Sequence, residues 1–571
     1  MSKIKESKEW RNKLYYGDNI DVLRKYIKDE SIDLCYIDPP FNSKRQYFQI
    51  YLNQGSEDKA QAQAFVDTWE WDKVAINGYD EIINNEKNIF SVQTIFLIEA
   101  LAKMWNKKGS LLAYLVHMTL RITEIQRVLK PTGSFYLHCD PTASHYLKLV
   151  CDSIFCAKGG DFKNEISWRR HYSHNDGNKF GCIHDVILYY TKSEEYIYNR
   201  QVIPYDDEYI KKNYASIDAK TGKRYRSVSM NAAGQGDAKI FFKKSLTPPH
   251  GTHWRWSQDR IDQAIKDGVI FLTSNGVPRY KQFLDEMEGV PVQDTWVDFY
   301  SLSSHDEERL GYPTQKPEAL LERMIKTSSN KGDTVLDAYC GCGTTVAVAE
   351  KLKRKWIGID ITYQSISLIL YRLEKSYGKK IKDEIELSGV PEDIESAEAL
   401  ANKKEDKTRK EFEKWCVLTY SDNKAMINEK KGKDSGIDGI ALMKDYKSKD
   451  DNSIELKNVY FSVKSDKKPH VSYIRDFHGT IKRDNAAFGV FISLYEPTKD
   501  MIDECKKLGS YQCNIIDKKY SIIKIVTVEE ILKGERLEIP LSHQTEVVKA
   551  AELKKDDSGQ GKLFKSPDEL F

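Results

Sequence analysis

The chain of 571 residues has few of the features that mark secreted, membrane-embedded or metal-built proteins. Its ten cysteines are scattered and form no Cys-x-x-Cys pair, so neither a disulfide framework nor a zinc site is indicated. No apolar run is long enough to cross a bilayer, and the charged first residues are unlike a secretory signal. We therefore expect a cytoplasmic protein.

Two further shortages narrow the possible functions. The chain has no Gly-x4-Gly-Lys-Ser/Thr sequence, which argues against a nucleotide-driven motor. Its net charge is only +2, but 30% of the residues are charged, so local patches decide whether a polyanion binds. The length exceeds what one hydrophobic core supports, and about two to four domains are expected.

The most informative segment is the apolar run 32–37, which ends in Asp38, Pro39, Pro40 and Phe41. It predicts a buried strand followed by a turn. An aromatic amino nitrogen is a poor nucleophile because its lone pair is delocalised into the ring. The Asp38 carboxylate and the Pro39 carbonyl could accept both amino hydrogens, and Phe41 could stack on a base extruded from a duplex. An ordinary Pro-Pro turn is the alternative, so a second motif is required.

That second motif lies far downstream, where residues 334–360 predict a strand, a glycine loop, a helix and another strand. Gly341 and Gly343 would let the backbone approach a ligand closely, and Asp360 at the end of the second strand could hold both hydroxyls of a ribose. A nucleoside cofactor fits this arrangement. An ordinary β-α-β unit would look similar, but the pairing with residues 38–41 favours the cofactor.

Together the two motifs resemble the S-adenosylmethionine-dependent amino-methyltransferases of DNA, in the permuted order of their β class. Segments 14–19, 129–140 and 312–317 support the resemblance, which covers roughly the first 380 residues. It implies an α/β fold with a doubly wound, Rossmann-like core, and no metal in the methyltransferase site. The catalytic residues that it implies are Asp38, Pro39, Pro40 and Phe41. The cofactor-binding residues that it implies are Asp18, Thr314, Gln315, Lys316, Asp337, Gly341, Gly343 and Asp360.

Two positions depart from the family pattern: Tyr312 stands where many relatives have His, and Ala338-Tyr339 where Pro-Phe is commoner. Neither removes a polar group that the chemistry needs. Asp38, rather than Ser, resembles the adenine-N6 enzymes more than the cytosine-N4 enzymes, although cytosine N4 stays open. Methylation at carbon 5 would need a cysteine nucleophile, usually in a Pro-Cys pair, and no proline is followed by Cys. The expected substrate is adenine in double-stranded DNA.

The stretch between the two halves interleaves aromatic and basic residues, at 168–171, 243–244 and 253–256. Such a composition suits phosphate contact, stacking and groove reading, and the family places target recognition here. Any single residue is still more often part of a solvated face or the core, so no base-reading residue is named.

The C-terminal part resembles the Mrr-like branch of the PD-(D/E)xK nucleases. Asp438 would be a Mg²⁺ ligand, Lys464 would steady the attacking water or the phosphate, and Glu413 would match the helix acid. Ser462, however, stands where active members carry Glu, Asp or Gln, and a hydroxyl is a weaker metal ligand than a carboxylate. Cleavage and binding alone both stay open.

These expectations give a domain plan. It comprises a catalytic half (1–165), a recognition insert (166–300), a cofactor half (301–385), a linker or solvated helix pair (386–410), a nuclease-related domain (411–540) and a flexible tail (541–571). In the tail, the segment from Gln560 to Phe564 resembles peptides that dock on the replicative sliding clamp. The function expected is modification within a bacterial or phage restriction-modification system. A single-chain modification and cleavage enzyme, a modification enzyme with a DNA-binding tail domain, and a non-catalytic DNA-binding scaffold are alternatives. The oligomeric state is open, a homodimer included.

Overall fold

The computed structural model describes residues 10–41, 45–53, 56–67, 69–105, 109–173, 180–303, 306, 308–310, 312, 314–402, 406–428, 436–447 and 453–540. The expected tail 541–571, including the segment from Gln560 to Phe564, lies outside these residues. The chain separates into two compact units, which are described in turn: Arg200–Gln293, and the remainder formed by Met1–Asn199 and Asp294–Phe571. Within the described ranges, every helix is too short or too polar to span a bilayer.

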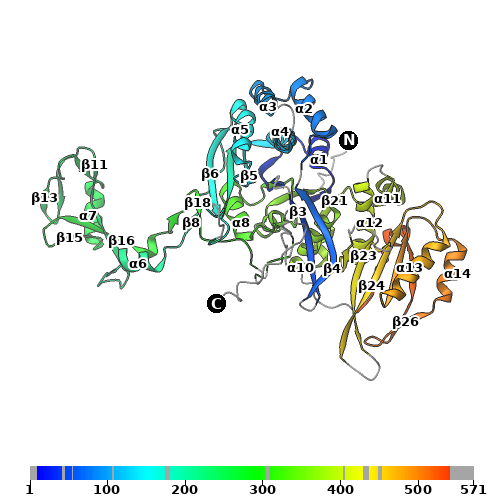
Figure 1. Ribbon diagram of the computed structural model, residues 1–571. Helices are drawn as coiled ribbons and strands as arrows, with labels where there is room; N and C mark the ends of the chain where they lie inside the picture. Colours follow the sequence, from blue (N-terminus) through cyan, green and yellow to red (C-terminus); the bar gives the residue numbers. More distant parts are fainter. Residues whose placement is uncertain are drawn as a thin grey trace, which may run out of the picture. The chain divides into compact units, whose positions relative to one another are not determined.

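A nine-stranded sheet forms the centre of the larger unit (Figure 1). Six neighbouring strands run parallel, and β7 then pairs antiparallel with both β5 and β6. In sheet order, the strands are β18 (Thr295–Trp296), β6 (Asp161–Arg169), β7 (His184–Thr191), β5 (Leu129–Cys139), β2 (Ile32–Ile37), β19 (Thr334–Asp337), β20 (Lys355–Asp360), β1 (Asn12–Tyr16) and β21 (Ile385–Ser388).

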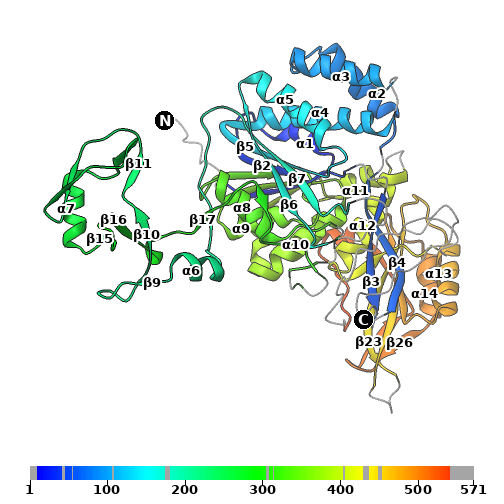
Figure 2. The same cartoon turned by 60° about the vertical axis from the view of Figure 1, so that its left-hand side comes forward.

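Helices cover both faces of this sheet (Figures 1 and 2), as the apolar runs of the inner strands require. One layer joins the main hydrophobic core and consists of α1 (Asn19–Tyr26), α2 (Lys73–Asn84), α3 (Val92–Met104), α4 (Ser110–Val128) and α5 (Ser144–Ile154). The other layer, below the sheet in Figure 1, consists of α8 (Glu318–Ser328), α9 (Thr344–Lys351) and α10 (Tyr363–Tyr377). The short 3₁₀ helices η1 (Cys156–Lys158) and η3 (Lys379–Glu384) follow α5 and α10.

The chain leaves β2 and β19 in opposite directions along the sheet. After β2 it crosses to β5, whereas after β19 it crosses through α9 to β20 on the other side. Such a switch point opens a crevice at the carboxyl ends of the two strands, where ligands bind in doubly wound folds. The two sequence motifs therefore meet at this point of the sheet. A hairpin of β3 (Arg45–Asn53) and β4 (Ser56–Asp67) follows the first of them.

The C-terminal part of the larger unit is built on a second sheet, in the order β22-β23-β24-β25-β28. Its strands are β22 (Ala425–Ile427), β23 (Gly439–Tyr446), β24 (Ile454–Lys464), β25 (Phe488–Ser493) and β28 (Ile523–Thr527), beside the pair β26 (Ser510–Cys513) and β27 (Lys518–Ser521). Its helices are α11 (Ile394–Ala401), α12 (Asp406–Tyr420), α13 (Val471–Arg483), α14 (Lys499–Lys507) and α15 (Val528–Leu532). The segment expected as a linker or helix pair thus contributes β21 and α11.

The smaller unit has its own core around Met230, Phe241, Trp254 and Ile261. Its entry and exit strands, β8 (Val202–Ile203) and β17 (Val290–Pro291), pair with each other. The remaining elements are α6 (Asp207–Asn213), β9 (Ser216–Ile217), β10 (Arg224–Ser229), β11 (Asn231–Ala233), β12 (Lys239–Phe241), β13 (Lys244–Leu246), β14 (Thr252–Trp254), α7 (Gln258–Lys266), β15 (Ile270–Leu272), β16 (Pro278–Phe283) and η2 (Leu284–Glu286).

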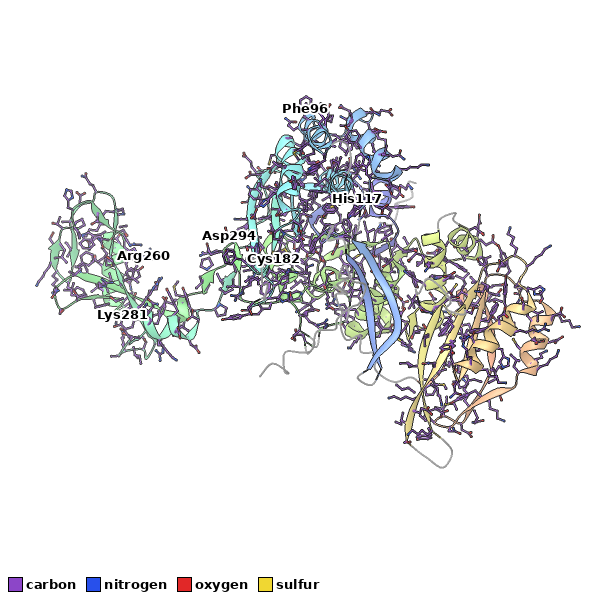
Figure 3. All side chains as sticks on the ribbon, in the orientation of Figure 1. Phe96, His117, Cys182, Arg260, Lys281 and Asp294 are labelled. Carbon is purple, nitrogen blue, oxygen red and sulfur yellow. The ribbon has the colours of Figure 1, made fainter. Side chains whose placement is uncertain are left out.

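This unit is narrower than the insert 166–300 expected from sequence. Strands β6 and β7 belong to the central sheet, because the buried apolar run of β7 pairs with β5. Within the unit, several aromatic and basic side chains are already engaged: Trp254 is buried, Arg260 lies over Trp256, and Lys281 is paired with Asp218 (Figure 3 labels Arg260 and Lys281). Trp168 likewise is a core residue of β6.

Candidate active site

Four acidic residues gather at the carboxyl edge of the central sheet. Asp38, Asp337, Asp360 and Asp18 each end a parallel strand or follow one closely. The register places Asp337 beside Tyr36 on β2 and Gly358 on β20, and Asp360 beside Tyr16 on β1. Because the carboxyl ends of parallel neighbours meet at one edge, the motif after β2 and the motif after β19 form one site.

Asp38 is held by one of its two carboxylate oxygens. Lys316 donates from Nζ to Asp38 Oδ2, and the two side chains are only 9% and 18% exposed. The other oxygen, Oδ1, is buried and has no hydrogen-bond partner among the described residues. Since a buried acceptor without a partner costs free energy, Oδ1 is suited to a donor that arrives with a ligand.

Phe41 has a cation and an imidazole as neighbours. Lys316 Nζ is 5.3 Å from the Phe41 ring centroid, and the His138 ring stacks on Phe41 with centroids 5.9 Å apart and planes inclined by 27°. His138 Nδ1 is 3.0 Å from Tyr36 Oη, and His138 Nε2 is 3.0 Å from Asp185 Oδ2. The ring that is expected to receive the base is therefore backed by a buried polar network.

Asp185 is charged in this network. Burial raises the pKa of Asp185, but the hydrogen bond and charge of His138, together with the charges of Arg170 and Lys316, outweigh burial and leave the pKa below its usual value. Arg170 Nε lies 3.0 Å from Asp185 Oδ1 as an ion pair, without the angles of a hydrogen bond. The Asp185 carboxylate thus favours a His138 tautomer that donates from Nε2.

The glycine loop between β19 and α9 requires its two glycines. Gly341 and Gly343 have φ of 48° and 74°, which L side chains rarely adopt. A Cβ at Gly343 would lie 2.6 Å from Ile369 Cγ1, and one at Gly341 would lie 3.1 Å from the Tyr312 ring. Tyr312, which departs from the family pattern, packs against Cys342 and lies 3.3 Å from Ser365 through its hydroxyl. Its ring therefore supports the loop.

The backbone of the loop anchors the acid at the end of β20. Gly341 N donates to Asp360 Oδ2 at 2.9 Å, and Thr362 N donates to Oδ1 at 2.9 Å. Burial nevertheless raises the pKa of Asp360 to about 6 and that of Asp337 to about 7. Both carboxylates would be relieved by a ligand that brings hydroxyl donors or positive charge, as a nucleoside with a sulfonium and an amino group does.

Asp18 and Tyr339 are tied into the layer that contains α4. Asp18 caps α1 and pairs with Arg121 at 2.6 Å. His117, on α4 in Figure 3, lies 3.0 Å from the Tyr339 hydroxyl through Nε2. Burial, and next the charge of Arg121, lower the pKa of His117, which is therefore neutral. The hydroxyl of Tyr339, at the position where Phe was expected to be commoner, has a partner on α4.

The remaining predicted residues do not all point to a ligand. Pro39 is buried, Pro40 and Phe41 are half-buried, and Thr314 has a φ of 62°. The Gln315 side chain is used by the preceding loop, donating to Glu308 O at 2.7 Å and accepting from Leu310 N at 2.8 Å. We predicted no role in the methyltransferase site for His138, Asp185, His117 or Arg121 from sequence. The only signal was the polar residue inside an otherwise apolar strand at His138 and Asp185, and helix α4 gave none.

A second cluster lies in the C-terminal domain. Val463 N donates to Asp438 Oδ2 at 2.7 Å, and Asp438 N donates to Phe461 O at 2.8 Å, so Asp438 sits beside β24. Ser462 and Lys464 share one face of β24, because side chains alternate along a strand. Burial raises the pKa of Cys416, as do Glu413 and Asp438, so both acids lie near this thiol.

Two acids near Cys416 thus lie beside β24, the strand that ends in a lysine. Ser462 is buried and contributes only a hydroxyl, at the position where a third acid was expected. Across the described ranges, His, Cys, Asp and Glu nowhere gather in a group of three suited to a metal ion. The four predicted nuclease-site residues therefore lack one of the carboxylates expected for a metal site.

Comparisons with known proteins agree with the two sites. Residues 32–370, more than half of the chain, match the DNA methylase family, and residues 405–519 match the restriction endonuclease family. The type II methyltransferase M.EcaI of Enterobacter cloacae is 32% identical over 262 residues, 46% of this chain and 57% of M.EcaI. The DNA adenine methyltransferase YhdJ of Escherichia coli K12 is 25% identical over 363 residues, 63% of this chain and 82% of YhdJ.

Further relatives show a similar extent. The Mod subunit of the type III restriction-modification enzyme StyLTI of Salmonella typhimurium is 26% identical, over 60% of this chain and 50% of Mod. The chain thus spans little more than half the length of M.EcaI and half of StyLTI Mod. Among solved structures, the complex of M1.HpyAVI with S-adenosylmethionine is similar over 63% of this chain and 98% of that chain, with 13% identity and a TM-score of 0.30.

The matched residues 32–370 include the acids at the ends of β2, β19 and β20, the glycine loop and Lys316. The match at 405–519 includes Glu413, Asp438, Ser462 and Lys464. This chain therefore belongs to the DNA methylase family and carries a C-terminal domain of the restriction endonuclease family.

Proposed function

We propose that this chain transfers a methyl group from S-adenosylmethionine to the N6 amino group of adenine at a specific site in double-stranded DNA. Its biological role would be DNA modification within a restriction-modification system, in the cytoplasm of a bacterium. The observation that carries the proposal is Asp38, fixed through Oδ2 by Lys316 with a buried Oδ1 left for a donor.

The chain's own residues supply positioning and electrostatics. Asp38 Oδ1 and the Pro39 carbonyl accept the two amino hydrogens, which localises the nitrogen lone pair for attack. Phe41 receives the face of the extruded base, and His138 limits the motion of its ring. Lys316 keeps the Asp38 carboxylate in one orientation, so the acceptor is in place before the base arrives.

The cofactor fits the carboxyl edge of the sheet. Asp360 would hold ribose hydroxyls, Gly341 and Gly343 would admit the ligand to the backbone, and the buried Asp337 would be relieved by positive charge. When bound, S-adenosylmethionine supplies a methyl group on a sulfonium. The amino nitrogen would gain this methyl group as the S–C bond breaks, the sulfur would keep the bonding electrons as a thioether, and the displaced amino proton would pass to water.

Adenine is favoured over cytosine on two grounds. Asp38 heads the Pro-Pro segment, as it does more often in adenine-N6 than in cytosine-N4 enzymes of the resembling family. The relative YhdJ is named a DNA adenine methyltransferase. Cytosine N4 offers the same exocyclic amino chemistry and is the alternative that nucleoside identification must separate.

The test is transfer of a radiolabelled methyl group to unmethylated genomic DNA, followed by digestion and chromatography of the nucleosides. We expect label in N6-methyladenine. Asp38→Ala should abolish transfer and keep cofactor binding, measured by calorimetry. Label in N4-methylcytosine, or none with the cofactor bound, would contradict the adenine assignment.

A second candidate function is Mg²⁺-dependent DNA cleavage by the C-terminal domain. The match to the restriction endonuclease family supports it, as does the position of Glu413 and Asp438 near Cys416 and of Lys464 at the end of β24. Asp438 would be the metal ligand, and binding of DNA without cleavage is the alternative because of Ser462. From sequence alone, we also propose docking of the segment from Gln560 to Phe564 on a sliding clamp, which a peptide competition assay would test.

A further inference from the structure

Helix α12 belongs to the C-terminal domain but packs against α10 of the methylase core. Glu411 on this helix reaches the methylase core with one carboxylate oxygen. Glu411 Oε2 accepts from Tyr363 N at 3.0 Å and from the Tyr16 hydroxyl at 3.4 Å. Lys414 Nζ donates to Oε1 at 2.9 Å, and the Glu411 and Lys414 side chains are only 15% and 8% exposed. Glu411 is therefore an ordered, largely buried ion-paired acid.

The two residues that Glu411 contacts flank Asp360. Tyr16 is the partner of Asp360 in the register of β1 and β20. Tyr363 is the first residue of α10 and follows Thr362, whose amide and hydroxyl both donate to Asp360 Oδ1. Glu411 thus forms hydrogen bonds with a residue on β1 and a residue at the start of α10, and both residues are next to the acid expected to hold the ribose.

Electrostatics favour this arrangement. A carboxylate at the first amide of α10 complements the positive end of that helix. Burial raises the pKa of Tyr16, and the charge and hydrogen bond of Glu411 raise it further, so the Tyr16 hydroxyl stays a donor. The same helix face is fixed by a hydrogen bond of 2.9 Å between the Tyr363 and Thr419 hydroxyls, and Ser367 bonds Asn423 just beyond α12.

We infer that Glu411 is a positioning residue for S-adenosylmethionine, through which the C-terminal domain completes the cofactor-binding end of the methylase core. The inference rests on the proposed function, because it assumes that Asp360 holds this cofactor. Glu411 acts through Asp360. When the Glu411 charge is lost, Tyr16 and the start of α10 are no longer held, and the Asp360 carboxylate loses its fixed orientation.

The coupling has a reciprocal consequence. Glu413 follows Glu411 by two positions, and side chains two apart on a helix do not face each other. Glu411 therefore faces the methylase core, whereas Glu413 lies near Cys416 and Asp438 in the nuclease-like cluster. If an ordered α12 favours the cofactor, then the cofactor must favour an ordered α12 by the same free energy. The stabilising effect of cofactor binding should therefore extend to the C-terminal domain through this helix.

The first test compares full-length Glu411→Gln with full-length Glu395→Gln, the same change at an exposed residue of α11. Calorimetry with S-adenosylmethionine alone should give an affinity weakened roughly 5- to 50-fold for Glu411→Gln, within the usual range of coupling. Glu411→Asp should lie in between. KM for the cofactor should rise, while kcat at saturating cofactor should stay within about twofold, because the residues around Asp38 are untouched.

The second test needs no variant. Hydrogen exchange of the wild-type chain should slow in peptides of α12 when S-adenosylmethionine is added, and stay unchanged in α13. Equal cofactor affinity of Glu411→Gln and Glu395→Gln, or unchanged exchange in α12, overturns the inference and leaves the proposed function standing. A wild-type chain that does not bind the cofactor overturns both. If Glu411→Gln does not fold, the exchange measurement decides.

Discussion

His138 Nε2 and Asp185 Oδ2 lie 3.0 Å apart in a pair sealed from solvent, next to the ring of Phe41. The two residues come from antiparallel strands β5 and β7, and His138 reaches the site through Phe41 and Tyr36. Their effect is to fix the imidazole, and with it one face of Phe41. A stacking residue that cannot move costs less entropy when the base arrives.

Removing the carboxylate should therefore slow methyl transfer. For Asp185→Asn and His138→Gln we expect kcat to fall about 10- to 100-fold, because Phe41 loses its fixed orientation. Cofactor affinity should not change. Single-turnover transfer to a DNA oligonucleotide measures the first quantity and calorimetry the second. His145→Gln, on the exposed side of α5, is the matched control. Wild-type rates for both variants would refute the role.

Lys316 offers a choice between two roles. If it holds Asp38, as the ion pair indicates, Lys316→Met should lower kcat about 100-fold and leave the dissociation constant of the cofactor unchanged. If it mainly binds the cofactor, as the family resemblance implies, that constant should rise instead. Lys316→Arg keeps the charge and should recover part of kcat. Calorimetry combined with single-turnover kinetics separates the two roles.

The pH dependence follows from the buried acids. Burial raises the folded-state pKa of Asp337 to about 7 and that of Asp360 to about 6, both above the ordinary 3.8. Protonation therefore favours the folded ligand-free chain, and this stability is lost as pH rises from about 4 to about 7. For Asp337 the loss is at most about 4 kcal/mol. Thermal unfolding at several pH values measures it.

The cofactor should reverse this trend. A ligand with positive charge prefers ionised carboxylates, so affinity for S-adenosylmethionine should rise between about pH 6 and pH 8. Asp337→Asn should flatten both the stability curve and the affinity curve in that window. An affinity that falls with pH in the wild-type chain would contradict the placement of the cofactor at these acids.

Gly343 should tolerate no side chain. Gly343→Ala adds a Cβ 2.6 Å from Ile369 at a φ of 74°, so we expect lower thermal stability, by about 1–3 kcal/mol, and weaker cofactor binding. Gly378→Ala is the matched control: φ is 82°, but no atom lies within 4 Å of the added Cβ. The control measures backbone strain alone. Equal cofactor affinities for the two variants would show that the clash is unimportant.

The C-terminal cluster can be tested by loss and by gain. If it cleaves DNA, Mg²⁺-dependent nicking of an unmethylated plasmid should disappear in Asp438→Ala and in Lys464→Ala. If the missing carboxylate at position 462 is what limits cleavage, Ser462→Glu should create or strengthen it, because it adds a carboxylate on the face shared with Lys464. An inactive Ser462→Glu that still binds DNA would favour a gripping role.

The ends of the strands could be predicted from the sequence, but the side-chain contacts between residues distant in the sequence could not. An apolar run closed by Asp38 and prolines, or by Asp337 and glycines, signals a buried strand and its loop, and parallel neighbours then bring the acids to one edge. Lys316 and Asp38 are 278 residues apart, and His138 and Asp185 are 47 apart, so no local pattern links them. Glu411 is one of several acids in a polar helix, where only packing against α10 distinguishes it.

The boundary of the recognition insert was also not predictable from the sequence. Its aromatic and basic residues were visible in the sequence, but the point where it leaves the core was not. The buried run of β7 could equally have opened a new domain, and its pairing with β5 decided the matter. The compact unit therefore begins at Arg200 and not near residue 166.

The pairing of β8 with β17 brings the entry and exit of that unit together, with Ile203 opposite Val290. A segment whose two ends are neighbours can be exchanged as a cassette without stretching the rest of the chain. Protein engineers could therefore cut at these two strands and graft the corresponding unit of another family member. On the expectation that this unit reads the DNA sequence, the hybrid should keep its chemistry and methylate a different site.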